Sequence, residues 1–287
     1  MIRLPLQQEM TGDQQNDLPV VLTVAGFDPS GGAGIIADIK TFVSFGRTPT
    51  AAITSLTFQN SEGVFGATHE SAASLRAQIL PIVEEFRVAA VKTGMLPTRE
   101  IVLEVARLIS EADLPAPVVD PVLRSTSGYE LMEADAIDVL IDELMPLARL
   151  ITPNIPEAEK LTDLRIEDEA GMRAAACKLR QMGARAVLIK GGHLHQRSEV
   201  SDQRSEVRGQ KSEQGFQAID VLDDEGQVTV FRGEWIDAPP VRGTGCMLSA
   251  AIAACLAQGV ELTESVKLAK QFVANAIRNA SRLAADP

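Results

Sequence analysis

The chain has 287 residues, of which 45% are hydrophobic and 23% are charged, a composition typical of a globular protein with a sizeable core. Its formal net charge of -12 argues against a nucleic-acid partner or an anionic membrane, although local lysines and backbone N–H groups can still hold a phosphate. The three cysteines show no CxxC spacing, so neither a disulfide framework nor a zinc site is expected. We find no signal-peptide pattern, and the longest apolar run, 246–259, is too short to span a membrane. We therefore expect a cytoplasmic protein.

Short apolar segments alternate with amphipathic ones from residue 20 onward. Strands are predicted at 20–26, 49–58, 88–94, 116–122, 149–154 and 186–192, with a hairpin around 216–232. Helices are predicted at 34–46, 71–86, 98–112, 133–145, 155–162, 167–182, 246–258 and 264–282. This alternation indicates an α/β fold with a parallel sheet covered on both faces. Ligands of such sheets bind beyond the carboxyl ends of the strands, where the glycine- and proline-rich loops fall.

Two polar segments lie outside this pattern. Residues 1–18 have no periodicity and are predicted to be a disordered N-terminal arm. Residues 196–215 repeat QRSEV at 196–200 and 203–207, but the apolar residues of a coiled coil are missing. We therefore predict a solvated, low-complexity insertion within a single domain that spans 19–287.

The stretch VRGTGCMLSAA, residues 241–251, places a cysteine where a glycine turn leads into a helix. A helix N-terminus offers unpaired N–H groups and a partial positive charge, which suit an anion. The same dipole can lower the pKa of a first-turn thiol such as Cys246 from about 8.5, and Arg242 would add to this effect if it points inward. The alternative is an ordinary glycine turn with a buried cysteine.

The loop AGFDPSGGAGIIAD contains GAGIIA at 32–37, which matches the dinucleotide-binding pattern G-x-G-x-x-A. That pattern normally opens directly from a strand, whereas five residues intervene here after Gly26, so an NAD-dependent dehydrogenase is disfavoured. Asp28 lies in the loop and Asp38 lies a helical turn past the glycines. Asp38 is either a functional carboxylate or an exposed first-turn residue.

Other loops carry polar groups at predicted strand ends. Asn154 and Glu157 could hold a hydrated Mg²⁺ or form a capping box. Lys190 could contact a phosphate or be solvated, and the Gln59 amide could donate and accept hydrogen bonds at the edge of a heterocycle. An anion hole, a magnesium ligand set, a lysine and an amide on an α/β sheet indicate phosphoryl transfer.

Several stretches occur together in one order: AGFDPSGGAGIIADIKTF, TSLTFQNSEGV, VKTGML, VVDPV, ITPNIPEAEKL, VLIKGGH and RGTGCMLSA. With these motifs, residues 20–282 resemble the hydroxymethylpyrimidine/phosphomethylpyrimidine kinases of the ribokinase-like superfamily. The resemblance implies a three-layer α/β/α fold with a mostly parallel central sheet, a homodimer, and Mg²⁺ with ATP as co-substrate. It also implies two successive phosphorylations in thiamine diphosphate biosynthesis, first of a hydroxymethylpyrimidine and then of its monophosphate.

The resemblance also assigns roles by matching position. It assigns the anion hole for the transferring phosphate to Gly243, Thr244 and Gly245. It places the Cys246 thiol beside the acceptor oxygen, where relatives generally hold an aspartate base. The pyrimidine-binding residues are Asp38, Gln59, Ala33, Met95 and Val122. The nucleotide side comprises Asn154, Glu157, Lys190 and Asp120, with the metal held by Asn154 and Glu157, directly or through water.

Three residues depart from the family pattern. Thr126 stands where the family usually has a lysine, and Arg124 could supply the phosphate contact of that lysine. Arg242 replaces a histidine before the GTGC motif, and Met247 replaces a threonine that often follows it. These departures bear mainly on the second phosphorylation, because its acceptor is more anionic. A pyridoxal or pyridoxine kinase is the main alternative, and a non-catalytic pyrimidine-binding module is a more remote one.

Overall fold

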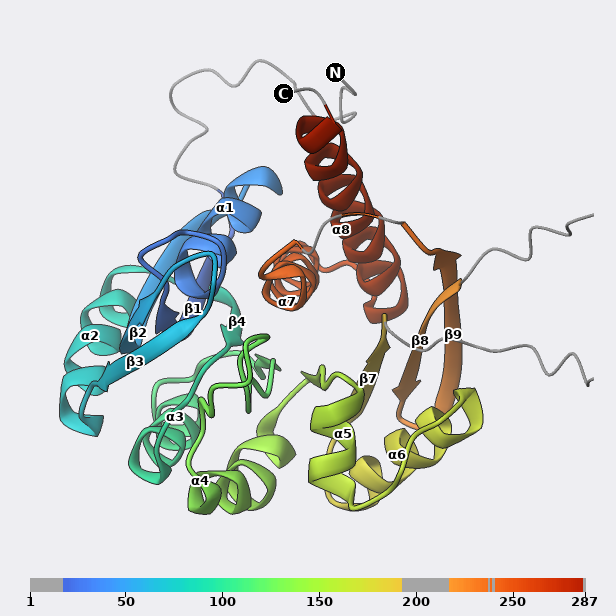
Figure 1. Cartoon of the computed structure of the whole chain (residues 1–287). Helices are drawn as coiled ribbons and strands as arrows, with labels where there is room; N and C mark the ends of the chain where they lie inside the picture. Colours follow the sequence, from blue (N-terminus) through green and yellow to red (C-terminus); the bar gives the residue numbers. More distant parts are fainter. Residues whose placement is uncertain (1–17, 193–216, 237, 239–240, 286–287) are drawn as a thin grey trace, which may run out of the picture.

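The computed structural model describes residues 18–192, 217–236, 238 and 241–285. The predicted insertion at 196–215 and all but the last residue of the predicted arm lie outside these ranges. Every strand of the described chain belongs to one nine-stranded sheet with the order β3-β2-β1-β4-β5-β6-β7-β8-β9 (Figure 1).

The centre of the sheet is parallel and its two ends are antiparallel. The parallel strands are β1 (Val20–Phe27), β2 (Thr48–Gln59), β4 (Val88–Thr93), β5 (Val118–Val119), β6 (Leu150–Ile151) and β7 (Ala186–Gly191). The antiparallel strands are β3 (Val64–His69), β8 (Gln217–Asp224) and β9 (Gln227–Glu234). The predicted mostly parallel sheet is confirmed.

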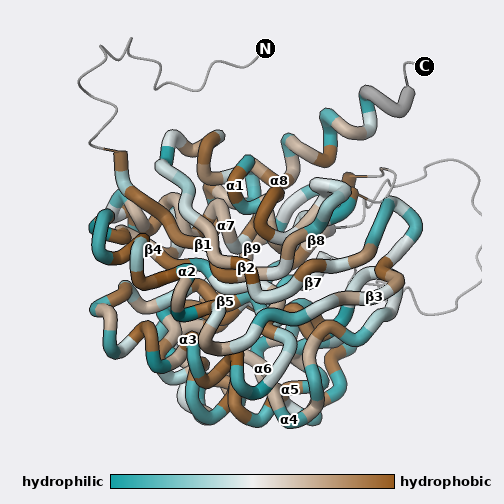
Figure 2. The backbone as a smooth tube through the Cα atoms, turned by 90° about the vertical axis from the view of Figure 1, so that its left-hand side faces the viewer, coloured by the Kyte–Doolittle hydropathy of each residue, from teal (hydrophilic) through white to brown (hydrophobic). Residues whose placement is uncertain are grey.

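Helices cover both faces of the sheet, which gives three layers (Figure 1). One face packs against α1 (Gly34–Ser44), α7 (Thr244–Leu256) and α8 (Leu262–Ala285). The other packs against α2 (Ala72–Glu85), α3 (Arg99–Glu111), α4 (Ala134–Val139), α5 (Ile155–Thr162) and α6 (Glu169–Gln181). Hydrophobic residues concentrate along the strands between these layers (Figure 2). The helix predicted at 133–145 is in fact α4 followed by one π-helical turn and one 3₁₀ turn.

The sequence-based prediction missed β3, which forms a hairpin with β2. β3 is an edge strand, and Phe65 on it is 66% exposed. A strand that buries little of its surface shows weak alternation of polar and apolar residues, and alternation is the signal by which strands are recognised.

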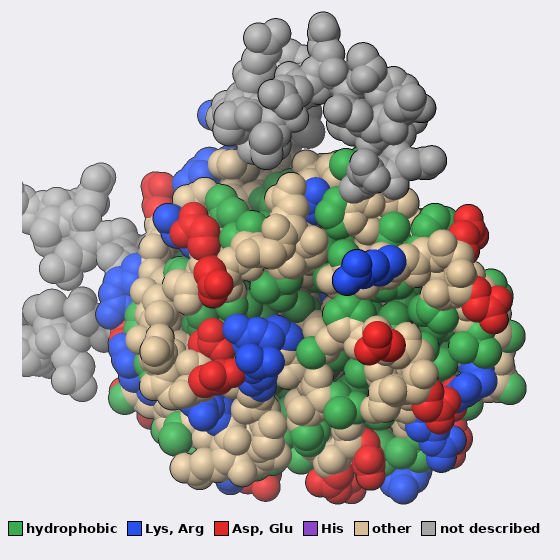
Figure 3. All heavy atoms as spheres, turned by 180° about the vertical axis from the view of Figure 1, so that it is seen from behind, with side chains coloured by type: hydrophobic (Ala, Val, Ile, Leu, Met, Phe, Trp, Pro, Cys, Tyr) green, Lys and Arg blue, Asp and Glu red, His purple; other side chains and the backbone are tan. Residues whose placement is uncertain are grey.

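The described residues include no helix with the length and apolar character needed to cross a membrane. On the face seen from behind, acidic and basic side chains are interspersed (Figure 3). The parallel strands all end at one edge of the sheet, and the first turn of α7 lies at this carboxyl edge, because Gly245 adjoins Lys190 near the end of β7. This edge holds the candidate site.

Candidate active site

The N-terminus of α7 is shaped by two glycine loops in close contact. Its N-cap, Gly243, has the left-handed φ of 71°, a conformation that favours glycine. A Cβ at Gly243 would lie 2.2 Å from the backbone oxygen of Gly32, so only glycine lets the two loops approach this closely. The first backbone N–H groups of a helix lack intrahelical partners. Those of Thr244, Gly245 and Cys246 are therefore left without intrahelical partners, as the predicted anion hole requires, and the anion hole itself stays a prediction.

A buried ion pair adjoins this helix end. Lys190 Nζ donates to Asp120 Oδ1 over 2.7 Å, and a Cβ on Gly245 would lie 3.3 Å from the same ammonium. The Asp120 carboxylate also accepts from the hydroxyls of Thr152 and Ser249, each over 3.3 Å. Burial would raise the pKa of Asp120, but Lys190 and Lys92 outweigh it and hold this pKa below its ordinary value. Lys190 is therefore not the solvated lysine of the alternative interpretation.

A second ion pair, near the Cys246 thiol, is completely buried. Lys92 Nζ donates to Asp38 Oδ2 over 2.8 Å, Thr23 Oγ1 donates to the same oxygen over 2.6 Å, and both charged side chains are 0% exposed. The other carboxylate oxygen, Asp38 Oδ1, has no hydrogen-bond partner among the described residues. Burial raises the pKa of Asp38, although Lys92 acts in the opposite direction. The interpretation of Asp38 as an exposed first-turn residue is wrong.

Lys92 is the charged residue that the sequence analysis missed. It lies in β4, in the otherwise apolar run VAAVKTG, and the only signal was a lysine inside a strand expected to be buried. Burial opposes its charge, but Asp38, Cys246 and Asp120 nearby raise the pKa of Lys92 above its ordinary value. The structure therefore places a buried cation in contact with Asp38 and within electrostatic reach of Asp120 and Cys246.

The Cys246 thiol lies in the first turn of α7 and is half-buried. Burial raises the pKa of Cys246 to about 11, while Lys92 and the Gly34 N–H act in the opposite direction. The prediction that the helix dipole lowers the pKa of Cys246 is thus wrong, because burial destabilises the thiolate more than the helix N-terminus stabilises it. At neutral pH Cys246 is a neutral thiol that can donate a hydrogen bond.

This protonation state predicts a slow alkylation of Cys246. Iodoacetamide attacks thiolates, so at pH 7.5 we expect Cys177, which is exposed, to react first. Reaction at Cys246 should accelerate as the pH rises toward its pKa of about 11. Cys255 is buried, with a pKa also raised to about 11, and serves as an internal control. Peptide mass spectrometry over pH 7 to 10 gives the rates, and alkylation of Cys246 as fast as Cys177 at pH 7.5 would contradict the assignment.

Asn154 and Glu157 form the capping box that begins α5. Asn154 Oδ1 accepts from the Glu157 N–H over 2.9 Å, and Glu157 Oε2 accepts from the Asn154 N–H over 2.8 Å. Burial raises the pKa of Glu157 to about 7, the Asp120 charge adds to this, and Lys190 opposes it. The capping interpretation is therefore realised, and the side-chain oxygen of Asn154 and one carboxylate oxygen of Glu157 are already engaged.

The Arg242 guanidinium faces two neighbouring loops and is not among the groups that shift the pKa of Cys246. It donates to Gln59 Oε1 over 2.9 Å, to Ser30 Oγ over 3.1 Å, and to the backbone oxygen of Asn60. It also pairs with Asp28 Oδ2 at 3.4 Å. The suggestion that Arg242 acts on Cys246 is thus not realised in this structure.

The three remaining predicted wall residues lie around this edge. Met95 is buried, and its sulfur would lie 2.9 Å from a Cβ on Gly26 at the end of β1. Ala33 is the N-cap of α1 and donates its N–H to Asp28 Oδ2 over 2.9 Å. Val122 is half-buried two residues after Asp120. The described structure thus brings the predicted residues of all three groups to the carboxyl edge of one sheet.

The comparison with known families identifies this architecture. A family model described as phosphomethylpyrimidine kinase matches residues 28–286. The chain belongs to the phosphomethylpyrimidine kinase family. It is therefore a kinase of the ribokinase-like fold, with ATP as the phosphoryl donor.

Individual members and solved structures agree with this assignment. The hydroxymethylpyrimidine/phosphomethylpyrimidine kinase of Streptomyces coelicolor is 39% identical over 259 residues, covering 90% of this chain and 88% of that protein. The crystal structure of phosphomethylpyrimidine kinase from Clostridium difficile 630 is 37% identical with a TM-score of 0.74, covering 90% of this chain and 99% of that chain. The pyridoxal kinase from Staphylococcus aureus in complex with AMP-PCP is 30% identical with a TM-score of 0.77, and the match covers 91% of this chain and 89% of that chain.

Arg124 pairs with another side chain of the same loop. It forms an ion pair and an isolated β-bridge with Glu130, and Thr126 beside it is exposed. In the described structure Arg124 thus pairs with Glu130, and its suggested phosphate contact in place of the lysine stays a prediction.

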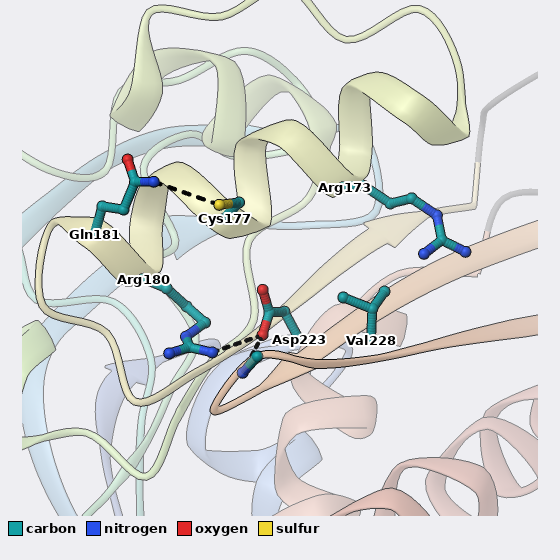
Figure 4. A pocket seen from close by; sticks show the side chains of 7 residues that line it. Arg173, Cys177, Arg180, Gln181, Asp223 and Val228 are labelled. Carbon is teal, nitrogen blue, oxygen red and sulfur yellow. Dashed lines mark hydrogen bonds and ion pairs between the residues drawn. The ribbon is translucent and has the colours of Figure 1, made fainter.

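A separate hollow of this kinase lies between α6 and the β8–β9 hairpin (Figure 4). Its lining residues are Arg173, Cys177, Arg180, Gln181, Asp223, Gly226 and Val228. Arg180 points to Asp223 and Gln181 to the Cys177 sulfur. Asp224 pairs with Ala186, the first residue of β7, so this hollow lies at the amino edge of the sheet, opposite the site.

Proposed function

We propose that the protein transfers the terminal phosphoryl group of ATP to 4-amino-5-hydroxymethyl-2-methylpyrimidine, and then to the resulting monophosphate, in thiamine diphosphate biosynthesis. One observation carries the proposal: the first turn of α7 adjoins the Lys190–Asp120 pair at Gly245, and its Cys246 lies near enough to the Asp38–Lys92 pair to feel both charges. The first pair suits a nucleotide phosphate, and the second suits a polar heterocycle with hydrogen-bond donors.

In this proposal the residues act mainly by position and charge. The N–H groups of Thr244 and Gly245 hold the transferring phosphoryl group, and Lys190 balances its charge. Asp38 Oδ1, which lacks a partner among the described residues, accepts a hydrogen bond from the pyrimidine. The neutral Cys246 thiol lies beside the acceptor hydroxyl and shares a hydrogen bond with it, since a loose transition state needs little proton removal early.

The donor set fits a hydrated magnesium ion. No cluster of three or more His, Cys, Asp or Glu side chains able to hold a metal occurs in the described ranges. Mg²⁺ usually keeps several waters and binds through one or two carboxylates and substrate phosphates. Glu157 and Asp120 would supply the carboxylates, and Asn154 would act through water. When bound, the ion neutralises phosphate charge.

Replacing Cys246 by alanine tests the role of the thiol. We expect kcat to fall more than tenfold, because the acceptor hydroxyl loses its hydrogen-bond partner. The KM for the pyrimidine should change little, because Asp38 and Gln59 remain in place. Steady-state kinetics gives both values, and an unaltered kcat would refute a chemical role for the thiol.

ATP consumption by the purified protein tests the proposed function directly. The acceptors are the hydroxymethylpyrimidine, its monophosphate and pyridoxal, each with and without Mg²⁺. Magnesium-dependent turnover of both pyrimidines is expected. Turnover of pyridoxal alone would move the assignment to a pyridoxal kinase, and tight pyrimidine binding without ATP consumption would indicate a non-catalytic binding module.

We propose further that residues 19–287 act as one cytoplasmic domain and that two copies form a homodimer. Large apolar side chains on the β2–β3 hairpin support an interface: Leu56, Phe58 and Phe65 are 42%, 55% and 66% exposed. Exposed apolar groups gathered on one element are typical of interaction surfaces. Light scattering should give about twice the 30.7 kDa of the chain, and a monomer mass at micromolar concentration would contradict the homodimer.

A further inference from the structure

Arg242 joins three segments that are far apart in the sequence. Arg242 itself directly precedes Gly243, the N-cap of α7. Its guanidinium contacts Asp28 and Ser30 after β1, and Gln59 and Asn60 at the end of β2. Asp28 is itself fixed, because its carboxylate accepts from the N–H groups of Ser30 and Ala33 over 2.8 and 2.9 Å and is 1% exposed. The guanidinium therefore pairs with a carboxylate whose orientation is fixed by backbone hydrogen bonds.

The contact with Gln59 fixes the orientation of its amide. A guanidinium has five N–H donors and no acceptor, so only the amide oxygen of Gln59 can face it, as the 2.9 Å distance to Oε1 records. The amide nitrogen then points the other way, and Gln59 Nε2 donates to no other described residue. An unconstrained glutamine can donate or accept, whereas this one is left as a donor.

We propose that Arg242 is a specificity-determining residue that acts through Gln59. By holding Oε1, it presents Nε2 as a hydrogen-bond donor, so the site selects a heterocycle with an acceptor atom, such as an unprotonated ring nitrogen, at that position. Arg242 is a positioning residue here and does not itself contact the substrate. The inference rests on the proposed function and names the feature of the substrate that the site reads.

The test compares the hydroxymethylpyrimidine with its two deaza analogues, in which one ring nitrogen is replaced by C–H. For the wild type, kcat/KM should fall about tenfold or more with the analogue that lacks the contacted nitrogen, because the donor is then left unpaired. In Arg242→Gln, Gln59 is free to rotate, and this discrimination should shrink to less than threefold. A discrimination unchanged from the wild type in Arg242→Gln would overturn the proposal.

A second variant examines the donor itself. Gln59→Glu keeps an acceptor for Arg242 but removes the N–H donor, so the KM for the pyrimidine should rise at least tenfold, with kcat and the KM for ATP within threefold of the wild type. The melting temperature should not fall, since the new carboxylate pairs with Arg242. A wild-type KM in Gln59→Glu would also overturn the proposal. Arg185 is an exposed arginine paired with Glu225 at the amino edge of β7, and Arg185→Gln is the matched control. It should change neither the discrimination between the analogues nor the KM for the pyrimidine.

Calorimetric binding of the same three compounds without ATP separates this inference from the proposed function. If the wild type binds the pyrimidine and discriminates against one analogue in an Arg242-dependent manner but consumes no ATP, the kinase proposal fails and the role of Arg242 stands. If it consumes ATP but binds all three compounds equally, the role of Arg242 fails and the kinase proposal stands. If none binds and no ATP is consumed, both fail.

Discussion

Replacing Lys92 by methionine is expected to destabilise the protein by about 3–5 kcal/mol, because it leaves the Asp38 carboxylate buried without its cation. Both side chains are 0% exposed, so solvent cannot take over the lost interaction. We also expect kcat/KM for the pyrimidine to fall at least a hundredfold, since Asp38 must then take up a proton or shift. Urea unfolding and steady-state kinetics measure the two effects.

The double variant Lys92→Met/Asp38→Asn separates charge from packing. Removing both charges should recover about 1–2 kcal/mol relative to Lys92→Met, because no unpaired ion remains buried, while activity should stay low. The control is Arg185→Met, which breaks an exposed pair with Glu225 and should cost less than about 1 kcal/mol. Wild-type stability of Lys92→Met would show that the pair contributes nothing.

Replacing Gly243 by alanine is expected to reduce kcat at least a hundredfold and stability by about 3 kcal/mol. The new Cβ would lie 2.2 Å from the Gly32 oxygen, and the residue has a φ of 71°. The atom that the new Cβ would meet belongs to the backbone of Gly32, so rotation of a side chain cannot relieve the overlap. The N–H groups of the first turn of α7 would move with the helix end.

Gly259 provides the control for backbone strain alone. Its φ is 75°, and the Cβ that an alanine adds there would meet open space, with no described atom beyond its chain neighbours within 4 Å. Gly259→Ala should cost about 1 kcal/mol and leave kcat unchanged, so the difference between the two variants measures the contact with Gly32. Equal effects of both variants on kcat would contradict the role of the close approach.

The order of elements was predictable from the sequence because most strands are buried on both faces and appear as continuous apolar runs. β1 and β7 are examples, with nearly every residue buried. β3 could not be predicted in this way, since its side chains are mostly exposed or half-buried. The helix before residue 148 was predicted in extent, but its change to π and 3₁₀ turns depends on packing that no local pattern records.

For the candidate site, the sequence located the positions but not their partners. The loops at strand ends could be found because parallel strands end at one edge. The pairing of Asp38 with Lys92 joins residues 54 positions apart, and Arg242 reaches Gln59 across 183 positions. Such contacts depend on side-chain direction in the folded state. The pKa of Cys246 was predicted in the wrong direction for the same reason, because burial is a tertiary property.

The hollow between α6 and the β8–β9 hairpin has a practical consequence for handling the enzyme. Cys177 is an exposed thiol on its wall, and this wall lies at the edge of the sheet opposite Lys190 and α7's first turn. A maleimide-bearing surface or dye would therefore attach on the side away from the substrates. The chain carries its own attachment point for immobilised assays, on the edge of the sheet opposite the candidate active site.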